Sequence, residues 1–134
     1  MAPEVGGALL IHTDDALPAV LELRASGLIL LPALRAAHRE IAALRARRKD
    51  LRVLLFDASA VERFGRGAVV EAARFTTRNA RNFDMAITVT HSPSLKSAAL
   101  ALAACAPSLR HVVVADRGAA IELLRARPAV AMTG

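Results

Sequence analysis

Aromatic residues and cysteine are scarce in this chain of 134 residues. It has four Phe, no Trp and no Tyr, and a single cysteine, Cys105. Proteins that bind single-stranded nucleic acid usually stack the bases on aromatic side chains, so the composition disfavours that class. One cysteine cannot form an internal disulfide, which excludes a disulfide framework and fits a reducing compartment.

The sequence also lacks segments that predict membrane insertion or secretion. Its longest apolar stretch, near residues 16–34, is interrupted by Glu22 and Arg24. A membrane span takes roughly 20 mostly apolar residues. The first residues lack the basic-then-apolar order of a secretory signal. We therefore expect a cytoplasmic protein that makes no membrane contact.

What the chain does contain is typical of one globular domain. Hydrophobic residues make up 54% and charged residues 22% of the sequence. This length suffices for one core without disulfides or metals. We predict a single domain over residues 1–134, with its core at about 8–126 and a frayed tail at 127–134.

The chain is basic, with a formal net charge of +6. Such a charge can indicate an anionic partner. Arginine far outnumbers lysine and alanine is abundant, as in proteins encoded by GC-rich genes. We favour this compositional origin for the charge over an anionic partner.

Hydrophobic periodicity predicts alternating strands and helices. A proline suits the first turn of a helix, and Pro32 and Pro93 are therefore read as helix starts. The expected order is β-β-α-β-α-β-α-β-α, with these approximate bounds: strands 8–12 and 19–24, a helix from Pro32 to Lys49, strand 51–57, helix 67–81, strand 85–90, helix 93–105, strand 111–115 and helix 117–125. This order predicts an α/β fold with a four- to five-stranded mixed sheet, mostly parallel after an N-terminal hairpin.

Two of the connections matter for function. Ser26 and Gly27 are expected to form a turn after the second strand. Residues 58–67, with Gly65 and Gly67, are expected to form a loop. Asp57 would then end a buried central strand, where open α/β sheets place ligand-binding residues. The alternative is that its carboxylate caps the following turn, which we favour.

The order of elements and the segment Val53-Leu54-Leu55-Phe56-Asp57-Ala58-Ser59-Ala60-Val61 resemble the STAS domain and its SpoIIAA-like relatives. In that family a hydrophobic strand ends in Asp-x-Ser-x-Val and leads through a loop to a helix. The closing stretch of the chain, residues 119–124, resembles the last helix of the family. The likeness covers residues 8–126.

The resemblance implies a regulatory domain that binds other proteins, often under the control of phosphorylation in that loop. This sequence departs from the pattern, because Arg66 and Gly67 stand where the family has its pair of serines. A shift of one residue gives Gly65 and Arg66. We therefore predict that the loop lacks a phospho-acceptor hydroxyl. Ser59 is interpreted as a turn hydroxyl that bonds nearby backbone.

The residues around this loop allow a second interpretation. Arg63 and Arg66, together with the N–H groups of Gly65 and Gly67, could form an anion site at the start of the next helix. Cations at a helix N-terminus are otherwise unfavourable by a few tenths of a kcal/mol. We favour a solvated loop over the anion site.

Arg74, Arg78 and Arg81 share one face of the same predicted helix. This row could bind an acidic protein surface or phosphates. The alternative is an ordinary solvated face in which Glu71 pairs with Arg74 at i,i+3 spacing, and this alternative is favoured.

No catalytic or metal-binding constellation is visible. The four histidines lack metal-ligand spacing, Ser92 is explained as a helix N-cap, and Cys105 is expected to be a buried, inert thiol. We therefore expect neither an enzyme nor a protein with a cofactor or metal.

The function predicted from these observations is a non-catalytic regulatory or protein-interaction domain. Its expected partner is another protein, and self-association as a homodimer stays open. The alternative is a domain that binds a small apolar, lipid-like ligand under its helices, since SpoIIAA-like relatives resemble a lipid-carrier fold. A nucleic-acid partner is a third hypothesis and is disfavoured.

Overall fold

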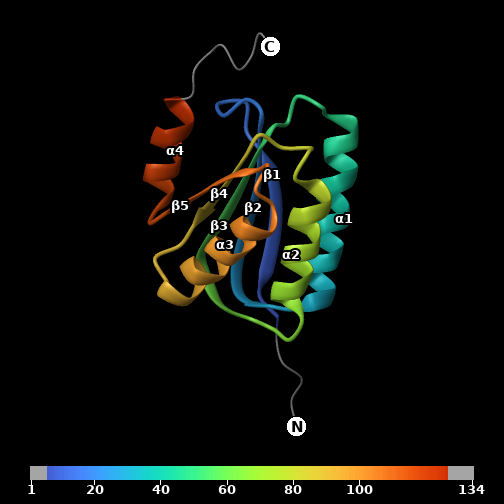
Figure 1. The fold of residues 1–134 in the computed structure, drawn as a ribbon, viewed down its shortest axis with the longest axis vertical. Helices are drawn as coiled ribbons and strands as arrows, with labels where there is room; N and C mark the ends of the chain where they lie inside the picture. Colours follow the sequence, from blue (N-terminus) through green and yellow to red (C-terminus); the bar gives the residue numbers. More distant parts are fainter. Residues whose placement is uncertain (1–5, 127–134) are drawn as a thin grey trace.

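The structure, a computed structural model, describes residues 6–126 and contains the predicted order of elements (Figure 1). The elements are β1 (Ala8–Thr13), β2 (Val20–Ile29), α1 (Leu31–Arg47), β3 (Val53–Phe64), α2 (Ala68–Asn79), β4 (Met85–Val89), α3 (Pro93–Cys105), β5 (Arg110–Val114) and α4 (Arg117–Arg125). The predicted α/β fold class is confirmed.

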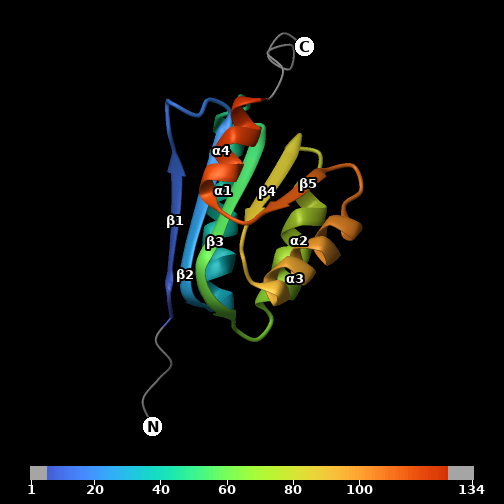
Figure 2. The ribbon, with the colours of Figure 1, turned by 90° about the vertical axis from the view of Figure 1, so that its left-hand side faces the viewer.

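The five strands form one mixed sheet in the order β1-β2-β3-β4-β5. β1 pairs with β2 antiparallel, and the other three pairings are parallel. Helices α1, α2 and α3 cover one face of the sheet and α4 lies on the opposite face, as the two views show (Figures 1 and 2). Within residues 6–126, no helix is both long and apolar enough to cross a membrane.

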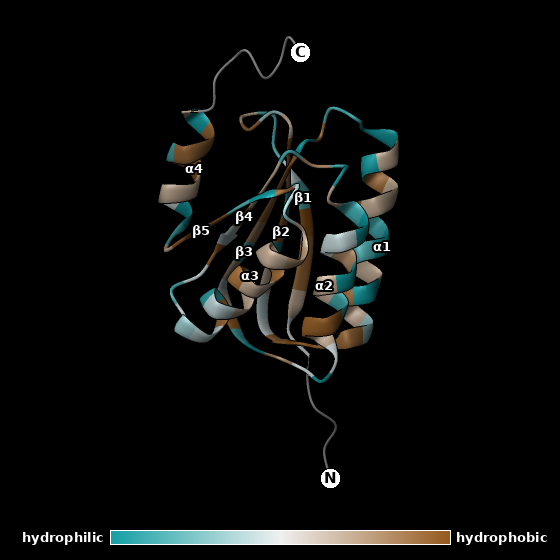
Figure 3. Cartoon of the chain, viewed as in Figure 1, coloured by the Kyte–Doolittle hydropathy of each residue, from teal (hydrophilic) through white to brown (hydrophobic). Residues whose placement is uncertain are grey.

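The central strands are largely hydrophobic, whereas the helices carry both hydrophobic and hydrophilic residues (Figure 3). Along the strands, side chains alternate between the two faces of the sheet. Leu21 and Leu23 of β2 are buried against α1 and α2, whereas Val20 faces α4. In β3, Val53 and Leu55 are fully buried on the α4 side. Apolar side chains on both faces explain why β3 is a nearly continuous hydrophobic run in the sequence.

The helices begin where the sequence predicts. Pro32 lies in the first turn of α1, and Ser92 caps α3 by accepting a hydrogen bond from the Leu95 N–H. Asp116 caps α4 and accepts from the Ala119 N–H at 2.8 Å. Side-chain acceptors of this kind satisfy N–H groups that have no partner inside the helix.

Two predicted connections are wrong, because Ser26 and Gly27 and most of the predicted loop, residues 58–64, are strand. β2 continues through Ser26 and Gly27 to Ile29, and β3 continues to Phe64, so that only residues 65–67 link β3 to α2. Beyond the end of β4, β3 pairs with β2 alone, and two register shifts place an extra β3 residue at each bulge. Burial of apolar side chains from both extensions outweighs the turn signals of the polar and glycine residues.

Gly27 sits at the second bulge with a φ of 71°. A Cβ on Gly27 would lie 3.1 Å from the Cα of Gly7, which enters β1 on the neighbouring strand. A Cβ on Gly7 would lie only 1.6 Å from the carbonyl oxygen of Ser26. The two glycines therefore allow the start of β1 to approach the bulge of β2 closely.

We expect Gly27→Ala to destabilise the protein by about 1–2 kcal/mol, because alanine is strained at positive φ and its methyl group meets Gly7. Urea denaturation measures the loss, and Ser26→Ala, at the neighbouring position with ordinary φ, serves as the matched control. Equal stability of the two variants would show that the bulge places no demand on Gly27.

Candidate functional site

The structure places the predicted site residues in three separate regions. Asp57 and Ser59 lie on the α4 side of the sheet. Arg74, Arg78 and Arg81 are exposed on α2 and directly after it, on the opposite side. The remaining four lie between them, at the end of β3 and in its link to α2: Arg63, Gly65, Arg66 and Gly67. The sheet thus lies between Asp57 and Ser59 on one side and the row of exposed arginines on the other.

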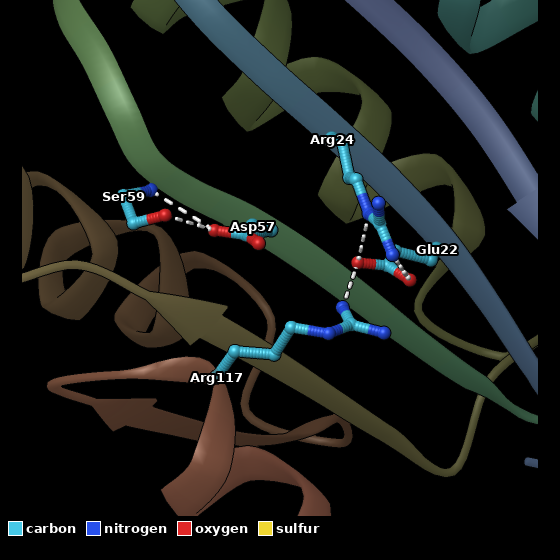
Figure 4. A network of polar contacts seen from close by, with 5 residues as sticks. All are labelled: Glu22, Arg24, Asp57, Ser59 and Arg117. Atoms are coloured by element: carbon cyan, nitrogen blue, oxygen red, sulfur yellow. Dashed lines mark hydrogen bonds and ion pairs between the residues drawn. The ribbon is translucent and has the colours of Figure 1, made fainter.

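Asp57 is inside β3 and does not end the strand, which corrects the sequence interpretation. It pairs with Val89, the last residue of β4, so it marks the point where the β3–β4 ladder stops. The Ser59 N–H and hydroxyl both donate to Asp57 Oδ1, at 3.1 and 2.6 Å (Figure 4). This pair spans the first bulge of β3 and gives the carboxylate local hydrogen-bond partners.

Gly65 and Gly67 have different roles in the short link. The Gly65 N–H donates to the Ile29 carbonyl at 2.7 Å, so one of the two N–H groups considered for an anion is already bonded. Gly67 is the N-cap of α2 in a left-handed conformation, with φ 81°. The link is therefore a strand-to-helix junction built by backbone contacts.

The outward face of α2 combines basic and apolar side chains. Val70, Arg74, Arg78 and Arg81 follow helical spacing and are all exposed, Val70 by 56%. We call these four residues the α2 surface. On the opposite side of the helix, Phe75 is buried in the core.

Glu71 does not pair with Arg74, contrary to the favoured sequence interpretation. It turns toward α1, where the His38 Nδ1 lies 2.6 Å from its Oε2 and the Arg35 Nε lies 3.8 Å from its Oε1. Within residues 6–126, Arg74 and Arg81 have no ion-pair partner. The row of arginines therefore keeps its charge available to a partner.

A buried glutamate paired with two partly exposed arginines connects α4 to the sheet. Glu22 of β2 is only 2% exposed. Its carboxylate accepts from the Arg24 Nε at 2.9 Å and from Nη1 of Arg117, the first residue of α4 (Figure 4). The hydrogen bond and negative charge of Glu22 raise the pKa of Arg24, and the charge of Asp57 adds to the effect. Glu22 and Arg117 are 95 residues apart, so no local pattern in the sequence indicates that they pair.

A cavity of about 100 Å³ lies on the other side of the sheet, beneath α1, α2 and α3. We call it the helix-side cavity. Alanines occur where helices and strands face each other across it, at positions 72, 86, 98 and 99. Their short side chains leave volume unfilled.

Two histidines line this cavity, and burial lowers the pKa of both. His38 stacks on Phe75, with ring centroids 4.0 Å apart. Its pKa stays lowered despite the opposing effect of Glu71, so the neutral ring donates its Nδ1–H to that carboxylate. His111 Nε2 lies 2.9 Å from Thr88 Oγ1, and its Nδ1 is buried without a protein partner among residues 6–126.

The structure also places the metal-ligating residue types and the single cysteine. In the described part of the chain, no three residues of the metal-ligating types gather in a group. Cys105 is exposed at the end of α3, and not buried as expected, because the chain leaves the core there.

Comparison with solved structures identifies a shared fold. An uncharacterized protein with a SpoIIAA-like fold from Shewanella loihica PV-4 matches with a TM-score of 0.70 and 14% identity, covering 92% of this chain and 98% of that protein. The anti-sigma factor antagonist SpoIIAA in its unphosphorylated form matches with a TM-score of 0.63 and 11% identity, covering 90% and 100%. An anti-sigma factor antagonist from Mycobacterium paratuberculosis gives 0.59 and 18%, covering 90% and 95%.

No protein-family model matches the sequence, and no curated protein matches it. At identities below 20% the likeness to solved structures establishes the fold alone. The chain therefore has the SpoIIAA-like, or STAS-like, fold that the sequence resemblance implied.

We expect Arg117→Met to lower the free energy of unfolding by about 1.5–3 kcal/mol, because a buried carboxylate loses a charged donor. In a Glu22→Leu background the same change should cost almost nothing, since no buried charge is left unpaired. A double-mutant cycle by urea denaturation measures the difference. Equal costs in the two backgrounds would contradict the role of the pair.

Stability should also fall on mild acidification. His38 and His111 have pKa values lowered in the folded protein, so the unfolded chain binds more protons below its histidine pKa of about 6.5. Stability is therefore fully present above that pH and decreases as pH falls toward the folded values, by at most about 1.4 kcal/mol per unit for each histidine. Glu71, whose pKa is also lowered, contributes only at lower pH, below about 4.5.

Urea denaturation at pH 7.5 and 5.5 checks this expectation. The decrease between the two pH values should be smaller in His111→Leu, because one of the two buried histidines is removed. A stability that does not change between these pH values would contradict the buried, neutral state of both rings.

Proposed function

Starting from the SpoIIAA-like fold of this chain, we propose that it is a non-catalytic regulatory domain that acts in the cytoplasm by binding another protein. The observation that carries the proposal is the α2 surface. Its arginines lie beside a valine that is 56% exposed, and Arg74 and Arg81 have no ion-pair partner within residues 6–126. Similar structures include anti-sigma factor antagonists, which supports a protein as the partner.

The chemistry of the α2 surface defines the partner further. Guanidinium groups form paired hydrogen bonds with carboxylates, and an exposed valine gains from burial in a contact. The partner is therefore a protein with an acidic surface around an apolar patch. The scarcity of aromatic residues still disfavours a nucleic acid, which would bind the same charges.

Binding at this surface does not require a phosphorylation switch in the link before α2. One similar structure is SpoIIAA in its phosphorylated form. In this chain residues 65–67 are Gly65, Arg66 and Gly67, which carry no hydroxyl. Ser59 is exposed, but its hydroxyl donates to the Asp57 carboxylate, and a phosphate there would be repelled by that charge.

Charge reversal on α2 tests the proposal. Arg74→Glu combined with Arg78→Glu should abolish capture of the partner by the purified, tagged protein, because the carboxylates would face an acidic surface. The matched control is Arg39→Glu with Arg47→Glu, which reverses two exposed arginines on α1. Captured proteins are identified by mass spectrometry, purified, and titrated against each variant by calorimetry.

The expected result is one acidic partner that binds the unmodified protein and the α1 control alike, with at least a tenfold weaker affinity for the α2 variant. Equal binding by both variants would place the interface elsewhere, such as the edge strand β1 with its exposed Leu10, through which a second copy could pair. Absence of any stoichiometric protein partner, in samples with and without phosphatase treatment, would contradict the proposed function.

A further inference from the structure

β1 is an edge strand without the features that normally prevent an edge from pairing. Within residues 6–126 it pairs with β2 alone and ends the sheet on one side (Figure 2). Edge strands usually carry charged residues, proline or bulges, or lie under another element. The six residues of β1, Ala8–Thr13, include no Lys, Arg, Asp, Glu or Pro, and they pair with β2 without a register shift. The opposite edge strand, β5, starts with Arg110 and contacts both α3 and α4.

Backbone groups of β1 face the open edge. The Gly7 N–H donates to the Leu28 carbonyl of β2 at 2.7 Å. Along a strand, successive residues direct their N–H and C=O groups to alternate sides, so those of Ala8, Leu10 and His12 point away from β2. No strand of the described residues lies at that edge. These three residues can therefore form a ladder with one further strand.

The side chains of β1 are apolar on both faces of the sheet. Leu10 is 57% exposed, more than any other large hydrophobic side chain among residues 6–126. It lies opposite Arg24, on the face that carries α4, but α4 packs on β4 and β5 and leaves Leu10 uncovered. On the other face, Leu9 and Ile11 pack against the core beneath α1. A partner strand would therefore bury apolar surface as well as bond the backbone.

We propose that a second copy of this chain pairs with β1 across this edge, antiparallel, so that the two sheets join into one. The two-fold axis passes beside Leu10. In this register Ala8 lies opposite His12 and Leu10 lies opposite its own counterpart, and each such pair exchanges two hydrogen bonds. A shift by one residue would place outward groups opposite inward ones. A shift by two would leave Ala8 or His12 without a partner. The inference goes beyond the proposed function and does not depend on it.

Two charged residues of α1 lie on the flank of the helix that faces this edge. α1 contacts α2 through its other flank, where Arg35 and His38 lie near Glu71. At about 100° per residue, Glu40 and Arg47 fall on the opposite side of the helix. Both are exposed, and neither has an ion-pair partner within residues 6–126. Because α1 contacts β1 as well as α2, this flank is directed toward the open edge.

These charges favour a second copy over an unrelated strand. A two-fold axis at β1 sets the two α1 helices antiparallel, which brings Glu40 of each copy toward Arg47 of the other. The same surface is therefore complementary to itself. Exposed ion pairs contribute little to affinity, but opposite charges distinguish a matching partner from others.

Sedimentation velocity over a range of protein concentrations measures the pairing. Leu10→Lys should weaken dimerisation at least tenfold, because two lysines would face each other at the axis and a charge blunts an edge strand. Leu100→Lys makes the same change on α3, at a leucine that is 53% exposed, and is the matched control. It should form the dimer as the unmodified protein does. Both leucines are exposed, so neither variant removes a core side chain.

Hydrogen exchange of the backbone amides locates the contact. The amides of Ala8, Leu10 and His12 should exchange more slowly as the protein concentration rises, because they become bonded to the second copy. In the Leu10→Lys variant they should exchange as exposed amides at all concentrations. The amides of Leu9 and Ile11, which face β2, should be protected in both proteins.

An exchange of charges tests the two-fold arrangement. Glu40→Arg and Arg47→Glu should each weaken dimerisation by about tenfold, since like charges then face each other across the axis. The double variant restores opposite charges and should recover the original affinity. If the double variant is weaker than both single variants, Glu40 and Arg47 do not face each other, and the two-fold arrangement is wrong.

Three further results would overturn the inference. The first is a monomer at every concentration of the unmodified protein. The second is equal dimerisation of the Leu10→Lys and Leu100→Lys variants. The third is exchange of the Ala8, Leu10 and His12 amides that does not depend on concentration. None of these results bears on protein capture by the α2 surface, since a monomer presents that surface unchanged, so the two proposals can fail separately.

Discussion

The long parallel pairing of β2 with β3 positions most of the other elements. These two strands continue together beyond the end of β4 and reach Ile29 and Phe64. The starts of α1 and α2 are therefore placed side by side just past the paired strand ends, where Leu34 and Ala68 join Ile29 in one apolar cluster. The contact between Glu71 and His38 follows from this arrangement, because it requires the N-terminal halves of the two helices to lie together.

The two faces of the sheet serve different physical purposes. On the face covered by α4, a buried carboxylate is compensated by two arginines, one of them the first residue of that helix. On the face covered by three helices, small side chains leave a cavity. Two histidines line this cavity, and burial lowers the pKa of both. Charge is concentrated where solvent or a counterion is available, and the neutral rings lie where burial disfavours charge.

The candidate surfaces are consequently independent of each other. The arginine row of α2 is exposed and lies on the outside of a helix whose inner side, through Phe75, helps to enclose the cavity. Asp57 and Ser59 bond to each other on the far side of the sheet. The α2 surface and the helix-side cavity are therefore connected only through the packing of that helix.

Local patterns in the sequence determined the order and type of the elements. Ser92 and Asp116 cap helices by contacts with residues three positions away, and Pro32 favours a first helical turn through its fixed φ. Alternation in β2 determined which side chains share a face. Only the tertiary structure decided that residues 58–64 are strand, because the gain comes from pairing with residues 26–29, which are distant in the chain. The same holds for Glu22 with Arg117 and for His111 with Thr88, whose partners lie 95 and 23 residues apart. Hydrogen bonds between distant residues leave no periodic signal, so folding alone brings these groups together.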